Sequence, residues 1–261
     1  MTARRVVPGP LSAFVLHAWD WSESSLIVDL FTRDRGRVVV VAKGAKRPTS
    51  QLRALLLPFQ RLSVMLGRAP ADEAAEVHPL RSAERLGGPP MPHGAGLFAA
   101  FYLNELVMRL LARQDAHPAL FDAYASALDS LQAADEAGVQ TVLRAFELAL
   151  LRETGVLPDL TTVTLTVQAV DPAREYTLHA ESGLVPQRSG PGLSGSALRA
   201  AEQALRAADF EQLRLAVQPA VAGWRNPLRE SLHYHLGSNT LRTRDVMREL
   251  SRLADPRGPR A

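Results

Sequence analysis

The sequence contains no cysteine. A chain without cysteine cannot form disulfides, thiol-based active sites, or zinc and iron–sulfur centres that depend on cysteine ligands. It also has no apolar run near the ~18 residues that a membrane-spanning helix requires, and no apolar signal-peptide segment at its N-terminus. These absences predict a cytoplasmic protein that has no membrane partner.

Motifs of catalytic and cofactor sites are missing too. The chain has no G-x-x-x-x-G-K-[ST], H-E-x-x-H or G-x-S-x-G pattern. Residues 190–195 spell G-x-G-x-x-G, but Pro191 removes a backbone N–H, so we expect a glycine-rich loop that leads into a helix cap. His233 and His235 are two residues apart on a predicted helix and therefore point to different faces. The sequence predicts no enzyme, no metal site and no cofactor.

Lysine is almost absent, and its placement is informative. Of 30 Lys and Arg residues, only Lys43 and Lys46 are lysines, and both follow the apolar segment 36–42, GRVVVVA. An apolar strand that ends in a basic, glycine-containing loop suits a phosphate backbone. The alternative is an exposed edge strand that basic residues protect against aggregation. The basic residues of this region are Arg35, Arg37, Lys43, Lys46 and Arg47.

Five short apolar segments bounded by turn residues precede residue 82 and predict β-strands. One long connection separates the third from the fourth. This arrangement is typical of a small closed barrel of the OB type, although an SH3-like barrel fits the same pattern. The five segments are residues 13–19, 25–31, 36–42, 59–66 and 74–80.

Charge is distributed unevenly. Residues 1–60 carry nine basic and four acidic residues, whereas residues 98–160 carry four basic and nine acidic residues. With a sequence pI near 9.7, this asymmetry makes the predicted barrel the candidate for a polyanionic partner.

Helical periodicity begins after the glycine- and proline-rich segment 87–94. The third predicted helix carries Arg144, Leu148 and Arg152 at four-residue spacing, which places a mixed cationic and apolar stripe on one face. Residues 162–170 and 175–179 read as a β-hairpin, and Asn226-Pro227 as a helix start. The predicted helices are residues 97–113, 118–131, 139–154, 196–208, 211–222, 226–237 and 243–253.

Several segments resemble the bacterial RecO family of recombination mediators, in that family's order and spacing. They are AFVLHAWDWSESSLIVDLFTRDRGRVVVVAKGAKRP, YLNELVMRLL with HPALFDAY, LRAFELALLRETGVLPDL, and HYHLGSNTLRTRDVMREL, about half of the chain. Many family members carry a cysteine-ligated zinc module after the PDL motif. This chain has no cysteine there, so the resemblance implies that the hairpin persists as a metal-free remnant.

The resemblance implies an α+β protein, with an N-terminal OB-fold β-barrel followed by an all-α helical bundle domain that carries a small metal-free β-hairpin insertion. It implies a protein that binds single- and double-stranded DNA, anneals complementary strands and, with RecR, helps load RecA onto DNA coated by single-stranded DNA-binding protein. It also places the docking pocket for the tail of single-stranded DNA-binding protein at Arg144 and Leu148, next to Arg152. The alternative is an OB-fold scaffold for protein partners without direct DNA binding.

We therefore predict an OB-fold domain at residues 1–82, a linker at 83–96, the helical domain at 97–158 and 193–254, the hairpin at 159–192, and a flexible tail at 255–261. Arg242, Arg244 and Arg248 extend the predicted DNA surface, or are only favourable cations on a helix face. Four barrel aromatic residues are candidates for base stacking, although strand alternation must bury some of them. They are Phe14, Trp19, Trp21 and Phe31.

Overall fold

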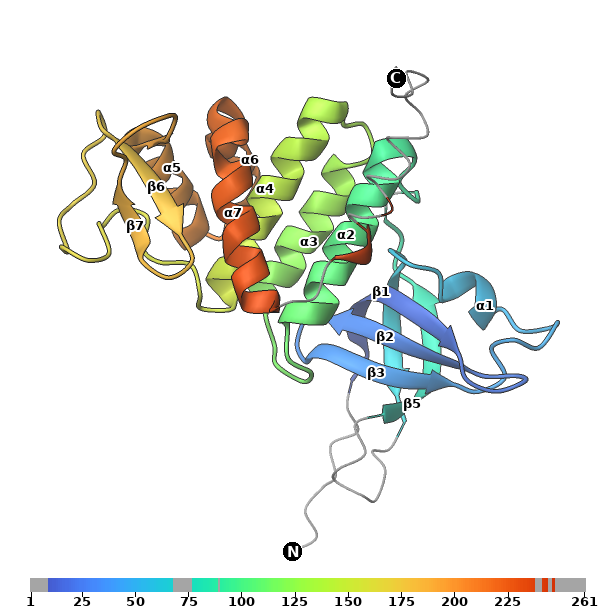
Figure 1. The fold of residues 1–261 in the computed structure, drawn as a ribbon. Coiled ribbons are helices and arrows are strands. Elements are labelled where there is room, and N and C mark those ends of the chain that lie inside the picture. The colour runs from blue at the N-terminus through green and yellow to red at the C-terminus, as the bar shows by residue number, and fades with distance from the viewer. Residues whose placement is uncertain (1–8, 68–76, 89, 238–240, 244–245, 247–261) are drawn as a thin grey trace, which may run out of the picture. The chain divides into compact units, whose positions relative to one another are not determined.

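The computed structural model describes residues 9–67, 77–88, 90–237, 241–243 and 246 (Figure 1). The chain divides into two compact units. The first holds the chain up to Met91 together with Leu111–Asp122, and the second holds residues 92–110 and the chain from Ala123 onward. The strip Leu111–Asp122 therefore belongs with the N-terminal strands, and not with the helical domain in which we placed it from sequence.

Five strands of the first unit form a closed barrel in the order β1-β2-β3-β5-β4. β4 pairs with β1 to close it, and β5 runs parallel to β3 and antiparallel to β4. This strand order confirms the OB-type barrel and disfavours the SH3-like alternative. The strands are β1 (Leu11–Asp20), β2 (Leu26–Thr32), β3 (Gly36–Ala42), β4 (Arg61–Leu66) and β5 (Val77–Arg85), and a short helix α1 (Leu52–Leu55) precedes β4.

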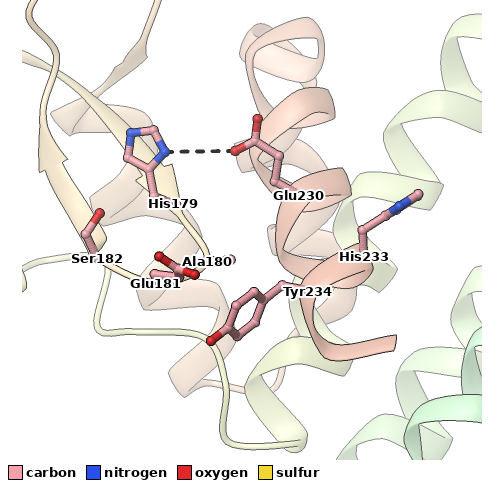
Figure 2. Close-up of a pocket in the computed structure, with 7 residues that line it drawn as sticks. All are labelled: His179, Ala180, Glu181, Ser182, Glu230, His233 and Tyr234. Carbon is pink, nitrogen blue, oxygen red and sulfur yellow. Dashed lines mark ion pairs between the residues drawn. The ribbon is translucent and has the colours of Figure 1, made fainter. Parts of the chain in front are cut away.

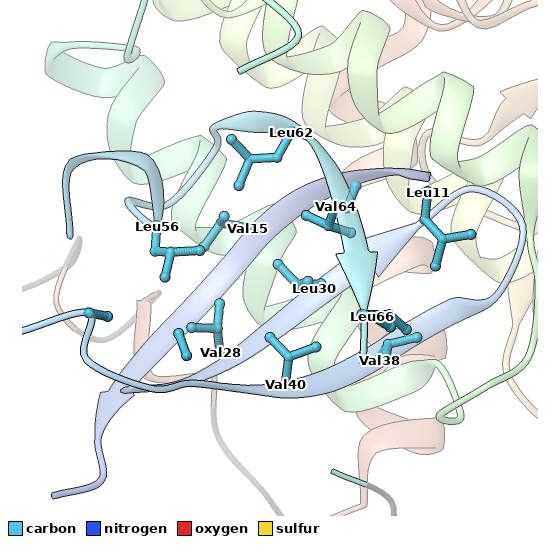
Figure 3. Close-up of a cluster of buried hydrophobic side chains, with 13 residues drawn as sticks. Leu11, Val15, Val28, Leu30, Val38, Val40, Leu56, Leu62, Val64 and Leu66 are labelled. Atoms are coloured by element: carbon cyan, nitrogen blue, oxygen red, sulfur yellow. The ribbon is translucent and has the colours of Figure 1, made fainter. Parts of the chain in front are cut away.

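Alternate residues of these strands fill the barrel, as the period of two along a strand requires (Figure 3). Val15, Val28, Leu30, Val40 and Val64 are each fully buried there. Burying a side chain of this kind stabilises a fold by about 1.5–3 kcal/mol. Among the described residues the interior is thus a packed hydrophobic core, so we look for a binding surface on the outside of the barrel and in its loops.

The second unit is mainly helical. Its central helix is α4, which packs against α2, α5, α6 and α7. Three of the helices begin at a side-chain cap, in which Asp135, Ser194 or Asp209 accepts a hydrogen bond from a backbone N–H of the first turn. The helices are α2 (Gly94–Leu110), α3 (Pro118–Ser130, whose first residues belong to the first unit), α4 (Glu136–Glu153), α5 (Gly195–Arg206), α6 (Phe210–Val217), the 3₁₀ turn η1 (Gln218–Ala220) and α7 (Val221–Leu236).

The predicted hairpin is present, but its strands differ from the prediction. β6 (Glu175–His179) pairs with β7 (Gly183–Pro186) and with β8 (Leu193–Ser194), not with residues 162–170. Residues 162–170 form a compact loop instead, joined by a single bridge between Thr162 and Ala169. In that loop the Thr164 hydroxyl accepts a hydrogen bond from the backbone N–H of Leu184 at 2.8 Å. Side-chain and backbone contacts therefore hold this region together, within the part of the chain that the structure describes.

Two helix boundaries were tested by the structure with different outcomes. The glycine-rich loop leads into a capped helix as predicted, because the Ser194 hydroxyl accepts from the Ala197 N–H at 3.2 Å. The predicted start at Asn226-Pro227 is wrong, since α7 begins at Val221 and continues through Pro227. Pro227 is the seventh residue of α7, beyond the first turn, so the helix continues there without the hydrogen bond that an N–H at this position would donate to the Gly223 carbonyl. Most of the predicted helix 243–253, and the tail 255–261, lie outside the described residues.

No helix among the described residues is both long and apolar enough to cross a lipid bilayer.

Candidate nucleic-acid interface

The basic loop leaves the barrel at the end of β3. Lys43 and Arg47 are exposed, whereas Ala45 between them is fully buried in the barrel core and anchors the loop. Gly44 adopts a φ of +72°, which glycine accepts at little cost, so the chain can turn back on itself. The turn closes with a hydrogen bond from the Arg47 N–H to the Gly44 carbonyl at 3.1 Å. Two cations are thereby held in solvent on a fixed loop.

Lys46 is directed to the β1–β2 loop, residues 21–25. Its Nζ lies 3.0 Å from a carboxylate oxygen of Asp20 and donates to the Ser22 carbonyl at 3.1 Å. Its backbone N–H donates to the Ser24 carbonyl at 3.0 Å. Asp20 is 77% exposed, and an ion pair of this kind stabilises a fold by only about 0–1 kcal/mol. A phosphate can therefore compete with Asp20 for the Lys46 ammonium group.

Arg37 is not placed as the sequence suggested. Its side chain is buried, its Nη2 lies 2.5 Å from a carboxylate oxygen of Asp29, and its Nη1 donates to the Leu111 carbonyl at 2.9 Å. A guanidinium group that is buried and paired in this way cannot meet a DNA phosphate, so we remove Arg37 from the predicted DNA-binding set. The signal in the sequence was a single acid in the apolar segment LIVDLF and a single base in GRVVVV. The two residues are diagonal neighbours on adjacent strands, since Asp29 pairs with Val39 and Arg37 with Phe31.

The strip Leu111–Asp122 covers one half of the outer face of β1, β2 and β3. Its Gln114 N–H donates to the Arg37 carbonyl at 2.9 Å, and the Phe121 ring packs on Phe14 and Phe31 with centroids 5.1 and 5.4 Å away. Phe14 and Phe31 are 3% and 0% exposed and are therefore unavailable for base stacking. The chain itself occupies this half of the face.

The other half of the outer face is open. Because paired residues point to the same side of a sheet, the pairs Trp19–Ile27, Ile27–Val41 and Val41–Pro79 form one row across four strands. Trp19 is 44% exposed, and Trp21, two residues further on, is 66% exposed. The other three residues of the row are partly exposed. This open row ends at the β1–β2 loop, beside Lys46.

The remaining predicted DNA contacts are scattered. Arg35 lies in the β2–β3 turn, at the opposite end of β3 from Lys43, roughly 25 Å away at the rise of an extended strand. Arg242 is exposed, and its backbone N–H donates to a carboxylate oxygen of Glu105 at 2.9 Å. Arg244 and Arg248 lie outside the described residues. The basic residues that the structure brings together on the barrel are Lys43, Lys46 and Arg47.

The predicted stripe for the tail of single-stranded DNA-binding protein does not form a surface pocket. Leu148 is 0% exposed, because α4 is the central helix of its unit. Arg144 is buried, with its Nη1 2.9 Å from a carboxylate oxygen of Glu147. Arg152 pairs with the buried Glu202. The expectation of a cation beside an exposed apolar hollow is therefore wrong at these three residues, since the helix periodicity did not reveal that both faces are covered.

A cationic hollow does exist nearby, on α5. It has a volume of about 490 Å³, and exposed Arg199 and Arg206 line it together with Thr161, Ser196 and Gln203. At its floor the Glu202 carboxylate accepts hydrogen bonds from the Arg206 side chain at 2.8 Å and the Leu160 N–H at 3.1 Å. We did not predict this site, because its arginines are ordinary helix-surface residues in the sequence.

A second hollow lies between the β6–β7 turn and α7 (Figure 2). It measures about 680 Å³ and is open to solvent, with Tyr234 55% exposed on one wall. The imidazole Nδ1 of His179 lies 3.9 Å from a carboxylate oxygen of Glu230. His233 also lines it, but among the described residues no group of three or more His, Cys, Asp or Glu side chains could hold a metal ion.

Comparison with known proteins covers both units. Residues 11–81 match the family model described as "Recombination protein O N terminal", and residues 93–245 match "Recombination protein O C terminal". The protein named "DNA repair protein RecO" of Variovorax paradoxus (strain S110) is 47% identical over 262 residues, which cover 96% of this chain and 99% of that one. Its namesakes of Delftia acidovorans (strain DSM 14801 / SPH-1) and Acidovorax ebreus (strain TPSY) are 46% and 45% identical, and each alignment covers 97% of this chain and 99% or 100% of the relative.

Proposed function

Because this chain belongs to the RecO family of DNA repair proteins, we propose that it is a recombination mediator. Its role lies in DNA repair and recombination. In the proposal it binds single- and double-stranded DNA, anneals complementary strands and, with RecR, helps load RecA onto DNA coated by single-stranded DNA-binding protein. It would do so on the chromosome in the bacterial cytoplasm, with RecA as an indirect partner.

The observation that carries the proposal is the basic loop on the barrel. Lys43 and Arg47 stand exposed on a loop that a buried alanine anchors, and Lys46 is held by a weak surface ion pair and a hydrogen bond to the Ser22 carbonyl. Cations in such positions neutralise phosphates and release counterions. Neutralisation also removes the repulsion between two DNA strands, so a protein of this kind promotes annealing without making or breaking a covalent bond. We assign it no catalytic reaction.

The test is DNA binding by the full-length protein over a range of salt concentrations. The triple charge reversal Lys43→Glu/Lys46→Glu/Arg47→Glu should remove most of the affinity for an oligonucleotide. Replacing Lys43 alone by glutamine should lower the slope of log affinity against log salt by about 0.7–0.9. Arg229→Gln, an exposed change on α7, is the matched control and should leave the slope unchanged. Affinity and slope that survive the triple reversal would rule out the loop as the contact surface.

For the tail of single-stranded DNA-binding protein, we propose the hollow on α5 in place of the predicted stripe on α4. An acidic peptide requires an accessible cation, and the exposed Arg199 provides one beside the small apolar side chain of Ala200, whereas Arg206 is already paired with Glu202 and Asp159. Arg199→Glu should weaken capture of the tail peptide at least tenfold. Arg188→Glu, an exposed control in the same unit, should not. Loss of binding with the control variant as well would mean that general charge, and not this hollow, attracts the peptide.

The second candidate function is a protein scaffold whose barrel binds RecR or another protein. The apolar open row on the barrel favours it, since a partly exposed apolar sheet surface also suits a protein partner. Binding of RecR with unchanged affinity in the triple charge-reversal variant, combined with no DNA binding by the wild type, would support this reading over the first.

A further inference from the structure

The open row on the barrel includes the exposed Trp19 and lies next to the exposed Trp21, and its chemistry suits unpaired bases. Trp19 and Trp21 are 44% and 66% exposed, large values for the largest of the aromatic side chains, and they flank Asp20 at the end of β1. Exposed aromatic rings next to basic residues are the usual means by which proteins hold single strands, because every base has a flat face. A base-paired duplex keeps those faces stacked internally and offers mainly phosphates.

The contacts on the barrel limit which part of its outer face can stack on bases. The strip Leu111–Asp122 places Phe121 on Phe14 and Phe31, so the aromatic rings at that half are already in contact with each other. Only the half that ends at the β1–β2 loop carries exposed rings among the described barrel residues. A bound strand would therefore meet a short stacking surface of a few bases.

Trp19 is also held in place. The His17 ring packs against it edge-on with centroids 4.4 Å apart. Burial lowers the pKa of His17 in spite of the opposing charge of Asp29, so the imidazole is neutral near pH 7 and acts as an uncharged support. An aromatic ring that is already fixed loses less conformational entropy when a base stacks on it.

Charge complementarity decides between a nucleic acid and a protein as the occupant. Lys43 and Arg47 are exposed, and Lys46 lies between them and the β1–β2 loop, so cations border the row at the same end as the tryptophans. The end of the barrel at the β1–β2 loop thus carries both aromatic rings that can stack on bases and cations that can bind phosphates. A protein partner would use the apolar row but has no general need of the cations.

We infer that Trp19, Trp21 and the row Ile27–Val41–Pro79 form a stacking site for a few unpaired bases of single-stranded DNA. The site gives the barrel a preference for single strands over duplex. This inference rests on the proposed DNA-binding function and adds to it the kind of strand that the site selects.

The experiment compares full-length variants with a fluorescent oligo(dT) of about 15 nucleotides and a blunt duplex of the same length, a length near the upper site size of one OB fold. Trp19→Ala and Trp21→Ala should each lower affinity for oligo(dT) about fivefold or more. Neither should change duplex affinity by more than about twofold, nor the salt slope, because no phosphate contact is lost. Trp21→Phe keeps an aromatic face and should restore most of the affinity.

Tryptophan fluorescence gives an independent measurement. The chain has three tryptophans, and Trp224 is fully buried in the second unit. In a Trp224→Phe variant all tryptophan emission comes from Trp19 and Trp21, so oligo(dT) should quench it and equimolar duplex should quench it much less. Thermal unfolding near the wild-type temperature verifies that the variants at the exposed positions Trp19 and Trp21 are folded. Trp224→Phe shrinks a fully buried side chain, so that background should melt at a lower temperature, and it is used only at temperatures where its thermal melt shows the folded state.

The outcomes separate the two proposals. Unchanged oligo(dT) affinity in both alanine variants, together with loss of binding after charge reversal at Lys43, Lys46 and Arg47, would overturn the stacking site and leave DNA binding intact. Equal losses for oligo(dT) and duplex would also overturn it, since the rings would then not select unpaired bases. Absence of binding by the wild type would overturn both, and loss of RecR binding alone in the alanine variants would assign the row to a protein partner.

Discussion

The buried pair of Asp29 and Arg37 provides the sharpest test of how the barrel is held together. In Arg37→Ala, the Asp29 carboxylate, which is 1% exposed, would keep its position without its cation, and the Leu111 carbonyl would lose a donor. Removing one partner of a buried ion pair costs about 3–5 kcal/mol. Against a total stability of roughly 5–15 kcal/mol, this is a large fraction. For a chain of this size the melting temperature should fall by about 6–20 °C.

Urea denaturation of the full-length protein measures the loss, and hydrogen exchange with mass spectrometry localises it to β2, β3 and the strip Leu111–Asp122. The companion variant Asp29→Leu/Arg37→Met removes both charges and keeps apolar volume. Replacing a buried ion pair in this way is often nearly neutral, so the double variant should be several kcal/mol more stable than Arg37→Ala. Its affinity for DNA should equal that of the wild type, because neither side chain is exposed.

The opposite pattern would refute the reasoning. If Arg37→Ala unfolds at the wild-type urea concentration but loses DNA affinity together with part of the salt slope, the side chain is a DNA contact. The prediction from sequence that Arg37 binds DNA would then be correct, and the Asp29–Arg37 pair would contribute little to stability. Equal destabilisation in the single and double variants would show instead that lost packing, and not the unpaired carboxylate, causes the effect.

Three further predictions concern single residues. Asp20→Asn should raise DNA affinity about two- to fivefold, because it frees Lys46 from a surface ion pair. Glu23→Gln removes a charge next to this pair without breaking it and should raise affinity less. Equal gains in the two variants would exclude competition between Asp20 and phosphate for Lys46. Gly36→Ala should destabilise the barrel by well over ~2 kcal/mol, because Gly36 has a left-handed φ and a Cβ there would lie 1.7 Å from the Asp115 carbonyl oxygen. Gly44→Ala should cost only about 1–2 kcal/mol, because the nearest atoms to its Cβ would be those of the Arg47 side chain at 3.5 Å. Thermal melts of the two variants measure the difference. Burial opposes ionisation of Glu105, but hydrogen bonds from Arg242 and Thr243 and the charge of Arg109 lower its pKa below the ordinary 4.5. The ionised carboxylate therefore contributes to stability above this pH, and the contribution is lost as the pH falls below it. The stability difference between wild type and Glu105→Gln should shrink from pH 5 towards pH 3, and a constant difference would contradict this assignment.

The barrel could be predicted from the sequence because its signals are local. Each strand has alternating or continuous apolar residues and ends at turn residues, and Gly36 marks the β2–β3 turn with a φ of +62°. The basic loop could be predicted for the same reason, since Lys43 and Lys46 follow the strand directly. The resemblance to the family is confirmed by similarity across both units.

What could not be predicted depends on contacts between residues far apart in the chain. Arg37 meets a carbonyl 74 residues away, and a segment of the helical region supplies Phe121 to the barrel surface. Periodicity places Leu148 on one face of a helix, but it cannot tell that other helices cover that face. Alternation along β1 likewise predicts that some aromatic residues are outward, yet only the position of the strip decides that Phe14 is buried and Trp19 is exposed.

The discontinuous make-up of the first unit has a consequence for biosynthesis. A ribosome that has released the chain up to Met91 has delivered all five strands, but Leu111–Asp122 is still to come. Until then the rings of Phe14 and Phe31 and the Asp29–Arg37 pair are exposed to solvent. The nascent barrel therefore presents an aggregation-prone apolar surface to chaperones and to other chains. A fragment cut at Met91 would keep that surface permanently exposed, so it should aggregate.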